Sequence, residues 1–435
     1  MTPNPALMDE HSLRLRIAGG IGVTGVGLIF ALGLRSPTGM YVGTLLTIIA
    51  LGLAIDRAGP VLVREPVFWL AVLLFVSVFL RGWVDLATAA ERGFEPDPDG
   101  VWHHARYTPL FAVVFGLWLA AFWHRRHILL VIFGLGFVIY MAQNWDRLLY
   151  TLPGGERPFG SAFGEAGLMG GTLVFLLAAA AIGFWRGTGR WRWLGLATAG
   201  GLALFAAGVF IAAQGRAVWL AMIGTLAVFA VAGAWYLYTR ATPVQRRNAL
   251  FAFGGSAVLA GIALALWWDV IAGRMMRDSE TIAVLLQGDV EPDDVPGGSV
   301  GDRYRMYRQG IIDVANHPWW GVGPASVRDM LHEIWGKPRG GSGNYHSTWF
   351  NLPVAMGIPW ALLWLGVHAW AVYRAARQLL VVDRDVVLGI ALIGAALVHF
   401  GTLTFQVRIW STGGSALYLI LMTIVIATFL RHRTR

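Results

Sequence analysis

Long apolar runs separated by short charged connections constrain this chain more than any other feature. A helix needs about 20 apolar residues to cross the roughly 30 Å hydrocarbon core of a membrane. Runs of about that size lie near residues 17–34, 40–55, 66–80, 108–123, 127–143, 166–185, 193–212, 217–237, 248–270, 351–373, 386–404 and 412–430. The pattern predicts an all-α polytopic membrane protein with about twelve transmembrane helices.

Composition agrees with this fold class and excludes some kinds of site. Of the 435 residues, 56% are hydrophobic and 14% are charged, whereas ordinary soluble domains have about 25% charged residues. The chain has no cysteine, which excludes disulfide bonds and cysteine-ligated metal sites. The N-terminus lacks the short apolar core and cleavage site of a signal peptide, so we expect the first run to be a retained span.

The distribution of arginine predicts the orientation of these spans. Short basic connections such as "HRRH", "RGTGRWR" and "RHRTR" alternate with longer, more acidic ones. Basic connections face the cytoplasm, so we expect both termini to be cytoplasmic. The organisation is then residues 1–270 with nine helices, an outer loop with amphipathic helices over 271–350, and residues 351–435 with three helices. A smaller outer loop covers 81–107.

Several arginines lie near the outer ends of the predicted helices, and Arg216 is the most informative. In "AAQGRAVWLAM" it stands in a very short hairpin at the N-terminal end of the eighth helix. That end already carries partial positive charge, so an added arginine destabilises it unless an anion is bound. We predict that Arg216 binds a phosphate group. A structural ion pair is the alternative. Arg147 and Arg157 lie at outer helix ends too, where they either reach the headgroups or contact an anionic ligand.

A second group of arginines begins the stretch "GDRYRMYRQGIIDVANHPWWGVG". Tyr304 and Tyr307 start an apolar repeat at helical spacing, so we expect an outer amphipathic helix packed on the membrane domain, with Asp302 as its N-cap. Arg303 and Arg305 then fall near the positive helix start. A guanidinium group matches phosphate oxygens, and we predict Arg303 as a ligand, with Arg305 a weaker candidate. Relief by the neighbouring Asp302 is the alternative.

His346 stands in "GNYHST", at the outer start of the tenth helix. Imidazole near a helix N-terminus tends to stay neutral, because the dipole opposes protonation. A neutral ring can accept a proton at physiological pH, so we predict a base beside an anion site. The alternative is an interfacial histidine bonded to a backbone carbonyl. The other histidines offer no dense ligand spacing, so we expect no metal. His368 and His399 lie in spans and are expected to link helices.

Three motifs together resemble those of the O-antigen ligase family. "QGRAVWLA" is similar to the family's "SRGAWLA" region, and "GDRYRMYRQGIIDVANHPWWGVGPAS" to its "R-x-x-x-W…hP-x-x-GvG" helix and turn. "GNYHSTWFNLPVAMGIPWAL" is similar to "HN-x-x-L-x-x-x-x-x-G-x-x-G". The carried-over residues are Arg216, Arg303 and His346. Ser347 departs from the common asparagine, and the outer connection between the last two spans offers Arg408 where some members have an acidic residue.

The resemblance implies a twelve-span membrane glycosyltransferase of the GT-C type in the bacterial inner membrane, with its active site facing the periplasm. Such enzymes transfer polysaccharide from undecaprenyl diphosphate to lipid A–core with inversion, without a metal or other cofactor. Arg216 and Arg303 would stabilise the leaving diphosphate and His346 would be the base. Arg305, Arg147 and Arg157 are further candidate diphosphate contacts. Membrane lipids, the donor and the acceptor are the expected partners, and nucleic acid is not.

Other functions fit parts of the same pattern. A polymerase that joins lipid-linked repeat units and a protein O-oligosaccharyltransferase would use the same donor site and differ in the acceptor. A glycan transporter would be expected to carry charges through the depth of its spans, whereas here they gather near helix ends. A structural scaffold would not need arginine at three helix starts.

Overall fold

We analysed a computed structural model of the chain. It describes residues 12–34, 36–143, 163–213, 215–239, 278–288, 290–335, 345–404 and 412–431, with a few isolated positions between 242 and 276. Within these ranges the regular structure is helical.

Apart from the run at 248–270, which lies almost wholly outside the described residues, each predicted apolar run lies in a helix. The helices are α1 (Leu13–Leu32), α2 (Pro37–Leu53), α4 (Pro66–Thr88), α6 (Leu110–Ala121), α7 (Arg126–Gln143), α9 (Phe163–Arg186), α10 (Arg192–Ala212), α11 (Arg216–Thr239), α17 (Thr348–Met356) with α18 (Ile358–Arg377), α19 (Val386–Thr402) and α20 (Thr412–Leu430). Among the described residues, six helices are long and apolar enough to cross a membrane. A seventh span results if α2 and α3 (Ile55–Val63), bent by 101° from each other, count as one. The chain is therefore a multi-pass membrane protein.

Small residues allow neighbouring helices to approach closely. A β carbon added to Gly25 of α1 would lie 2.7 Å from the carbonyl oxygen of Gly43 on α2, and the reverse is also true. On α9, a β carbon at Gly170 would lie 2.6 Å from the carbonyl of Ala206 on α10. Such close backbone approach is how membrane helices associate where apolar burial gives no driving force.

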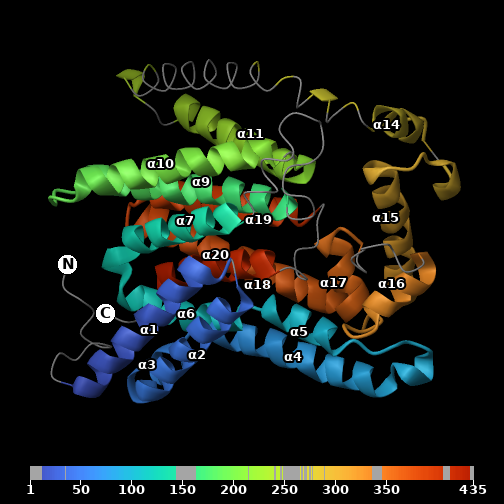
Figure 1. The fold of residues 1–435 in the computed structure, drawn as a ribbon, viewed down its shortest axis with the longest axis horizontal. Helices are drawn as coiled ribbons and strands as arrows, with labels where there is room; N and C mark the ends of the chain where they lie inside the picture. The colour runs from blue at the N-terminus through green and yellow to red at the C-terminus, as the bar shows by residue number, and fades with distance from the viewer. Residues whose placement is uncertain are drawn as a thin grey trace.

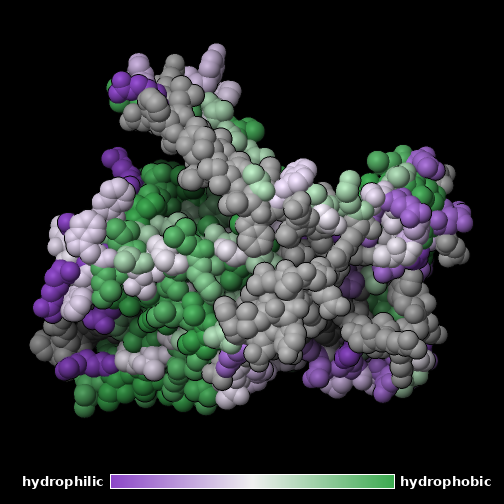
Figure 2. Space-filling model, turned by 45° about the horizontal axis from the view of Figure 1, so that its top comes forward, coloured by the Kyte–Doolittle hydropathy of each residue, from purple (hydrophilic) through white to green (hydrophobic). Residues whose placement is uncertain are grey.

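The outer surface of the bundle is apolar. Large hydrophobic side chains stand exposed on several helices, including Leu204, which is 77% exposed, and Val231, which is 71% exposed. Figure 2 shows this hydrophobic surface over the bundle, with hydrophilic side chains gathered toward its ends. In water such a surface would drive aggregation, so lipid is its natural solvent.

Ion pairs hold several of the predicted cytoplasmic connections together at one end of the bundle. Arg126 binds Asp385 at 3.1 Å, joining the starts of α7 and α19. Arg374 of α18 binds the buried Glu65 at 2.7 Å. Arg14 with Asp56 and Arg431 with Asp383 form two further pairs. Every partner comes from a connection predicted to face the cytoplasm, so the five connections that carry these partners lie at one end of the bundle, as the charge pattern predicted for them.

The segments predicted to face outward gather at the opposite end. Here α14 (Ser279–Leu285) contacts α15 (Ser299–Asn316), which packs on α17. Together with α16 (Val327–Trp335) these helices lie on the right of Figure 1. The shorter α5 (Pro98–Arg106) packs against α4.

Helix α4 carries the polar groups that hold this outer assembly. It continues to Thr88, so the predicted end of the third run at residue 80 is wrong. Arg81 donates hydrogen bonds of 3.0 Å to the carbonyls of Trp320, Gly321 and Val322. These partners in the turn after α15 satisfy the guanidinium, so the helix can continue past it.

Asp85, one turn further along, anchors the same turn. Its fully buried carboxylate accepts hydrogen bonds from the backbone N–H groups of Ala325 and Ser326 at 2.7 and 3.0 Å. It also accepts from the Ser326 hydroxyl at 2.7 Å and pairs with Arg92. We call Asp85, Arg81 and Arg92, with the turn 320–326 that they bind, the turn clamp.

The histidines predicted to link spans are buried between helices. His368 of α18 contacts the Trp364 carbonyl at 2.6 Å and the Tyr418 hydroxyl of α20 at 2.5 Å, which confirms the predicted link. His399 of α19 packs against the rings of Phe400 and Tyr418.

Candidate functional site

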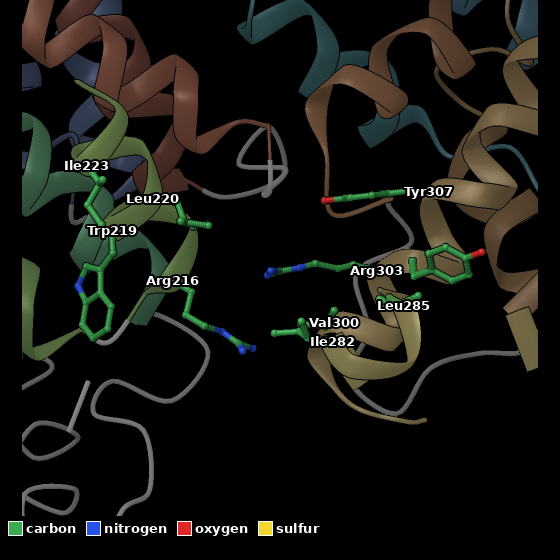
Figure 3. A pocket seen from close by; sticks show the side chains of 11 residues that line it. Arg216, Trp219, Leu220, Ile223, Ile282, Leu285, Val300, Arg303 and Tyr307 are labelled. Carbon is green, nitrogen blue, oxygen red and sulfur yellow. The ribbon is translucent and has the colours of Figure 1, made fainter. Parts of the chain in front are cut away.

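Arg216 and Arg303 line one cavity of about 490 Å³. Arg216 is the first residue of α11, as predicted, and Arg303 comes from α15, 87 positions later in the chain. Figure 3 shows the two guanidinium groups extending toward each other from opposite walls. The structure therefore brings together the two arginines that the sequence singled out.

The remaining walls of the cavity are mainly apolar. Trp219, Leu220 and Ile223 of α11 form one side, and Ile282, Leu285 and Val300 the other. Tyr304 and Tyr307 of α15 add two aromatic rings to the lining. A space with two cations and apolar walls suits an amphiphilic molecule with an anionic group.

Arg216 already has an acidic partner. Its guanidinium forms an ion pair with Asp278, and the two side chains are 13% and 9% exposed. The structural ion pair that the sequence left open as an alternative is therefore present. It explains how a cation is tolerated at the positive start of α11, because the carboxylate compensates it.

The start of α15 differs from the expectation. Gly298 occupies the N-cap position with φ 122°, and the helix begins at Ser299, so Asp302 is not the N-cap and lies in the first turn. Glycine tolerates this backbone conformation, which side chains with a β carbon disfavour. Consequently Arg303 and Arg305 lie beyond the first turn, where the helix dipole acts on them less than we inferred.

Arg305 is held by its own loop. It donates to the carbonyls of Pro292 and Val295 at 3.2 and 2.8 Å and pairs with Asp302 at 3.0 Å. It is not among the residues that line the cavity. These contacts fasten the 290–295 segment to α15.

His346 contacts one of the residues that line the cavity but is not itself part of the lining. Its backbone carbonyl accepts a hydrogen bond of 3.4 Å from the hydroxyl of Tyr307, whereas the ring itself is not part of the lining. The residue adopts a left-handed backbone with φ 50° immediately before α17, whose N-cap position is Ser347. Residues other than glycine seldom adopt this conformation, and those that do cluster at functional sites.

Neighbouring groups fix this turn. The buried Tyr345 donates a hydrogen bond to the carboxylate of Asp313 on α15, and the pKa of Tyr345 is raised by burial and by this bond. Tyr307 packs on Phe350 of α17 with ring centroids 5.1 Å apart, and burial raises its pKa as well. The turn that carries His346 and the helix that carries Arg303 are therefore held together at two points.

Two predicted contacts, Arg147 and Arg157, and the departing position Arg408 lie outside the described residues. His104 is buried in α5 and its Nδ1 contacts the Gly100 carbonyl at 2.7 Å. In the described ranges no group of three or more His, Cys, Asp or Glu residues could hold a metal ion.

Sequence reasoning missed Asp278 and most of the apolar lining. Asp278 occurs in "RMMRDSETIAV", with arginine on its N-terminal side and serine and glutamate after it, and nothing local marks it as special. Its role follows from its pairing with a residue 62 positions earlier. The apolar lining from α14 belongs to a segment that sequence analysis assigned to the outer loop without further detail.

A family model described as O-antigen ligase matches residues 201–365. The matched stretch extends from α10 into α18 and contains Arg216, Asp278, Arg303 and His346. This match supports assigning the chain to that family, as the three motifs suggested. Members are glycosyltransferase-like membrane enzymes, either ligases or polymerases, which act on lipid-linked glycans. Comparison with curated proteins gave no match.

Proposed function

We propose, on the premise of membership in the O-antigen ligase family, that this protein transfers a polysaccharide from undecaprenyl diphosphate to lipid A–core. The observation that carries the proposal is the cavity shared by Arg216 and Arg303. Two guanidinium groups match a diphosphate, and the apolar walls match the adjoining prenyl chain. Two segments far apart in the chain supply these features to one space.

The chemistry of the reaction explains the need for two cations. Bond cleavage between the anomeric carbon and the phosphate oxygen leaves the electron pair on the diphosphate, so negative charge grows there in the transition state. Fixed cations in a largely apolar cavity stabilise that charge more than water does. In this proposal Arg216 and Arg303 perform this role without a metal ion. Arg305, whose donors are occupied by its own loop, supports Arg303 by fixing the start of α15.

His346 is the proposed base. An acceptor hydroxyl oxygen attacks the anomeric carbon from the side opposite the leaving diphosphate, which inverts the configuration. The hydroxyl proton passes to the imidazole as the new carbon–oxygen bond forms. A positioned base contributes typically about 10²–10⁴-fold to the rate. The hydrogen bond from Tyr307 to the His346 carbonyl supports this role, because Tyr307 lies in the cavity wall itself.

We further propose that the protein resides in the bacterial inner membrane, with both termini in the cytoplasm and the cavity on the periplasmic side. The end of the bundle that gathers the short basic connections would face the cytoplasm. The opposite end, with α14, α15 and the cavity, would face the periplasm. In this arrangement residues 1–270 and 351–435 form the membrane part, and 271–350 the periplasmic loop.

The test is transfer by the purified protein from an undecaprenyl diphosphate-linked polysaccharide to lipid A–core. Arg216→Ala, Arg303→Ala and His346→Ala should each lower the rate by at least about 100-fold. The matched control is Arg328→Ala, which removes an exposed arginine of the same outer end that pairs with Asp97. Near wild-type transfer by His346→Ala would remove the base assignment.

The acceptor distinguishes ligation from polymerisation. Cells lacking a ligase accumulate capped lipid-linked polymer and make no long-chain lipopolysaccharide. Cells lacking a polymerase still attach single repeats to the core. A deletion strain with the second phenotype would replace the ligase proposal by the polymerase, and glycans found on proteins would indicate a protein O-oligosaccharyltransferase.

A further inference from the structure

Asp278 joins the Arg216 side chain of α11 to the start of α15. One carboxylate oxygen, Oδ2, pairs with Arg216, the first residue of α11. The other, Oδ1, faces the beginning of α15, where a β carbon added to the N-cap Gly298 would lie 3.0 Å from it. Helix N-termini attract anions, and here one carboxylate lies beside the start of α15 and pairs with the guanidinium of Arg216.

The carboxylate is not used to cap its own helix. Asp278 occupies the N-cap position of α14, where an aspartate side chain usually accepts a hydrogen bond from a backbone N–H of the first turn. The side chain makes no such bond. It turns toward Arg216 instead and is buried there, with 9% of its side chain exposed. Its charge is thus directed at a residue of the cavity wall.

This position conflicts with the binding of a diphosphate. A carboxylate and a diphosphate that share one guanidinium repel each other, because like charges a few ångströms apart in a partly buried site interact strongly. Either the carboxylate stays and weakens binding, or it leaves Arg216 when the diphosphate arrives. Both outcomes make Asp278 a competitor of the ligand.

We propose that Asp278 is a built-in counter-ion for Arg216, which the diphosphate of the donor displaces and which returns when the diphosphate leaves. This inference rests on the proposed function. Between turnovers the carboxylate neutralises Arg216 beside the apolar walls. After transfer it competes with the diphosphate product for the same guanidinium and so speeds product release. Asp278 is a positioning residue, since it acts through Arg216.

The experiment measures binding of inorganic pyrophosphate to the purified full-length protein in detergent, by calorimetry, with and without Asp278→Asn. Asparagine keeps the size of the side chain and can still accept a hydrogen bond from Arg216, but it removes the charge. We expect pyrophosphate to bind about tenfold more tightly to the variant. Asp278→Glu, which keeps the charge, should bind like wild type.

The matched control is Asp302→Asn. This carboxylate lies on the same outer end, in the first turn of α15, but pairs with Arg305 and is 57% exposed. The substitution Asp302→Asn removes the same formal charge as Asp278→Asn but leaves the contacts of Arg216 unchanged, so the affinity for pyrophosphate should change less than twofold. A tenfold gain in both variants would mean that long-range charge, and not the contact with Arg216, sets the affinity, and would overturn the inference.

Steady-state kinetics of transfer supply a second measurement, because a purely structural role of Asp278 predicts a different change in KM. Asp278→Asn should lower KM for the donor and lower kcat, with stronger inhibition by added undecaprenyl diphosphate. If Asp278 serves only as a structural support, the variant binds pyrophosphate equally or more weakly and KM rises, which refutes the inference while the proposed function stands. Absence of pyrophosphate binding by wild type and variant alike, with unimpaired transfer by Arg216→Ala, refutes both.

Discussion

The turn clamp makes a strong prediction about stability. Asp85→Ala removes a carboxylate that is fully buried and that four donors share: two backbone N–H groups, the Ser326 hydroxyl and Arg92. The substitution leaves these donors without their acceptor in a site that is closed to water. The side chain of Arg92 is 34% exposed, so it recovers only part of its hydration.

The cost follows from the unmet donors. A buried donor that loses its partner costs about 1–3 kcal/mol, and removing one member of a buried ion pair costs about 3–5 kcal/mol. These two costs overlap, because they count some of the same bonds. We therefore expect Asp85→Ala to lower the free energy of unfolding by about 3–5 kcal/mol.

The assay is thermal unfolding of the purified protein in detergent, followed by intrinsic fluorescence. The control is Asp56→Ala, which breaks the half-exposed pair with Arg14 at the other end of the bundle. Exposed pairs contribute about 0–1 kcal/mol, so this variant should melt close to wild type. An Asp85→Ala protein that melts within one or two degrees of the Asp56→Ala control would refute the reasoning.

Three further predictions concern the same outer end. Gly323→Ala should destabilise the protein as much as Asp85→Ala, because φ of Gly323 is 124° and an added β carbon would collide with the Asp85 carboxylate. In thermal unfolding, the double variant should lose less stability than the sum of the two single losses. Burial lowers the pKa of His104 from its ordinary 6.5 to about 4. The folded protein therefore keeps the ring neutral, and stability that is complete above pH 6.5 is lost as the pH falls toward 4. Between pH 7 and pH 5 the wild type should lose about 2 kcal/mol more than His104→Asn in denaturant unfolding; equal losses would contradict this. Tyr345→Phe removes the hydrogen bond to the buried Asp313, so we expect about 1–3 kcal/mol of destabilisation. The variant should have a lower kcat and unchanged pyrophosphate binding. A change in pyrophosphate binding alone would show that Tyr345 acts on the cavity and not on the His346 turn.

Hydropathy predicted where the apolar helices lie, and charge predicted several connections that share one end of the bundle, because both signals are local. An apolar run such as 193–212 contains all the information needed to form α10, and a basic connection such as "HRRH" needs no partner to indicate its end of the bundle. Helix limits were less predictable where polar residues have distant partners. Arg81 looked like the end of a span, and α4 continues past it because its donors reach carbonyls 239 or more positions away.

The candidate site shows the same division. The motifs drew attention to Arg216, Arg303 and His346. No spacing in the sequence says that the first two share a cavity while the third only contacts its wall through Tyr307. Asp302 was expected to cap α15, because aspartate often occupies the N-cap position. Instead Gly298, with its positive φ, is the N-cap, and the helix begins at Ser299, three residues before Asp302. Pairings across the chain, such as Arg216 with Asp278, depend on the fold as a whole.

The two arginines of the cavity belong to different parts of the structure. Arg216 belongs to α11, a candidate membrane span, whereas Arg303 belongs to α15, which packs on α17 and continues into the turn held by the turn clamp. The distance between the guanidinium groups is therefore set by how α15 docks on the bundle, and the clamp fixes that docking from α4. A substitution such as Asp85→Ala should accordingly affect transfer through Arg303 although it lies in no part of the cavity lining. Its signature would be a rise in KM for the donor at temperatures well below unfolding. An unchanged KM would mean that contacts with α17, among them the stacking of Tyr307 on Phe350, hold α15 without the clamp.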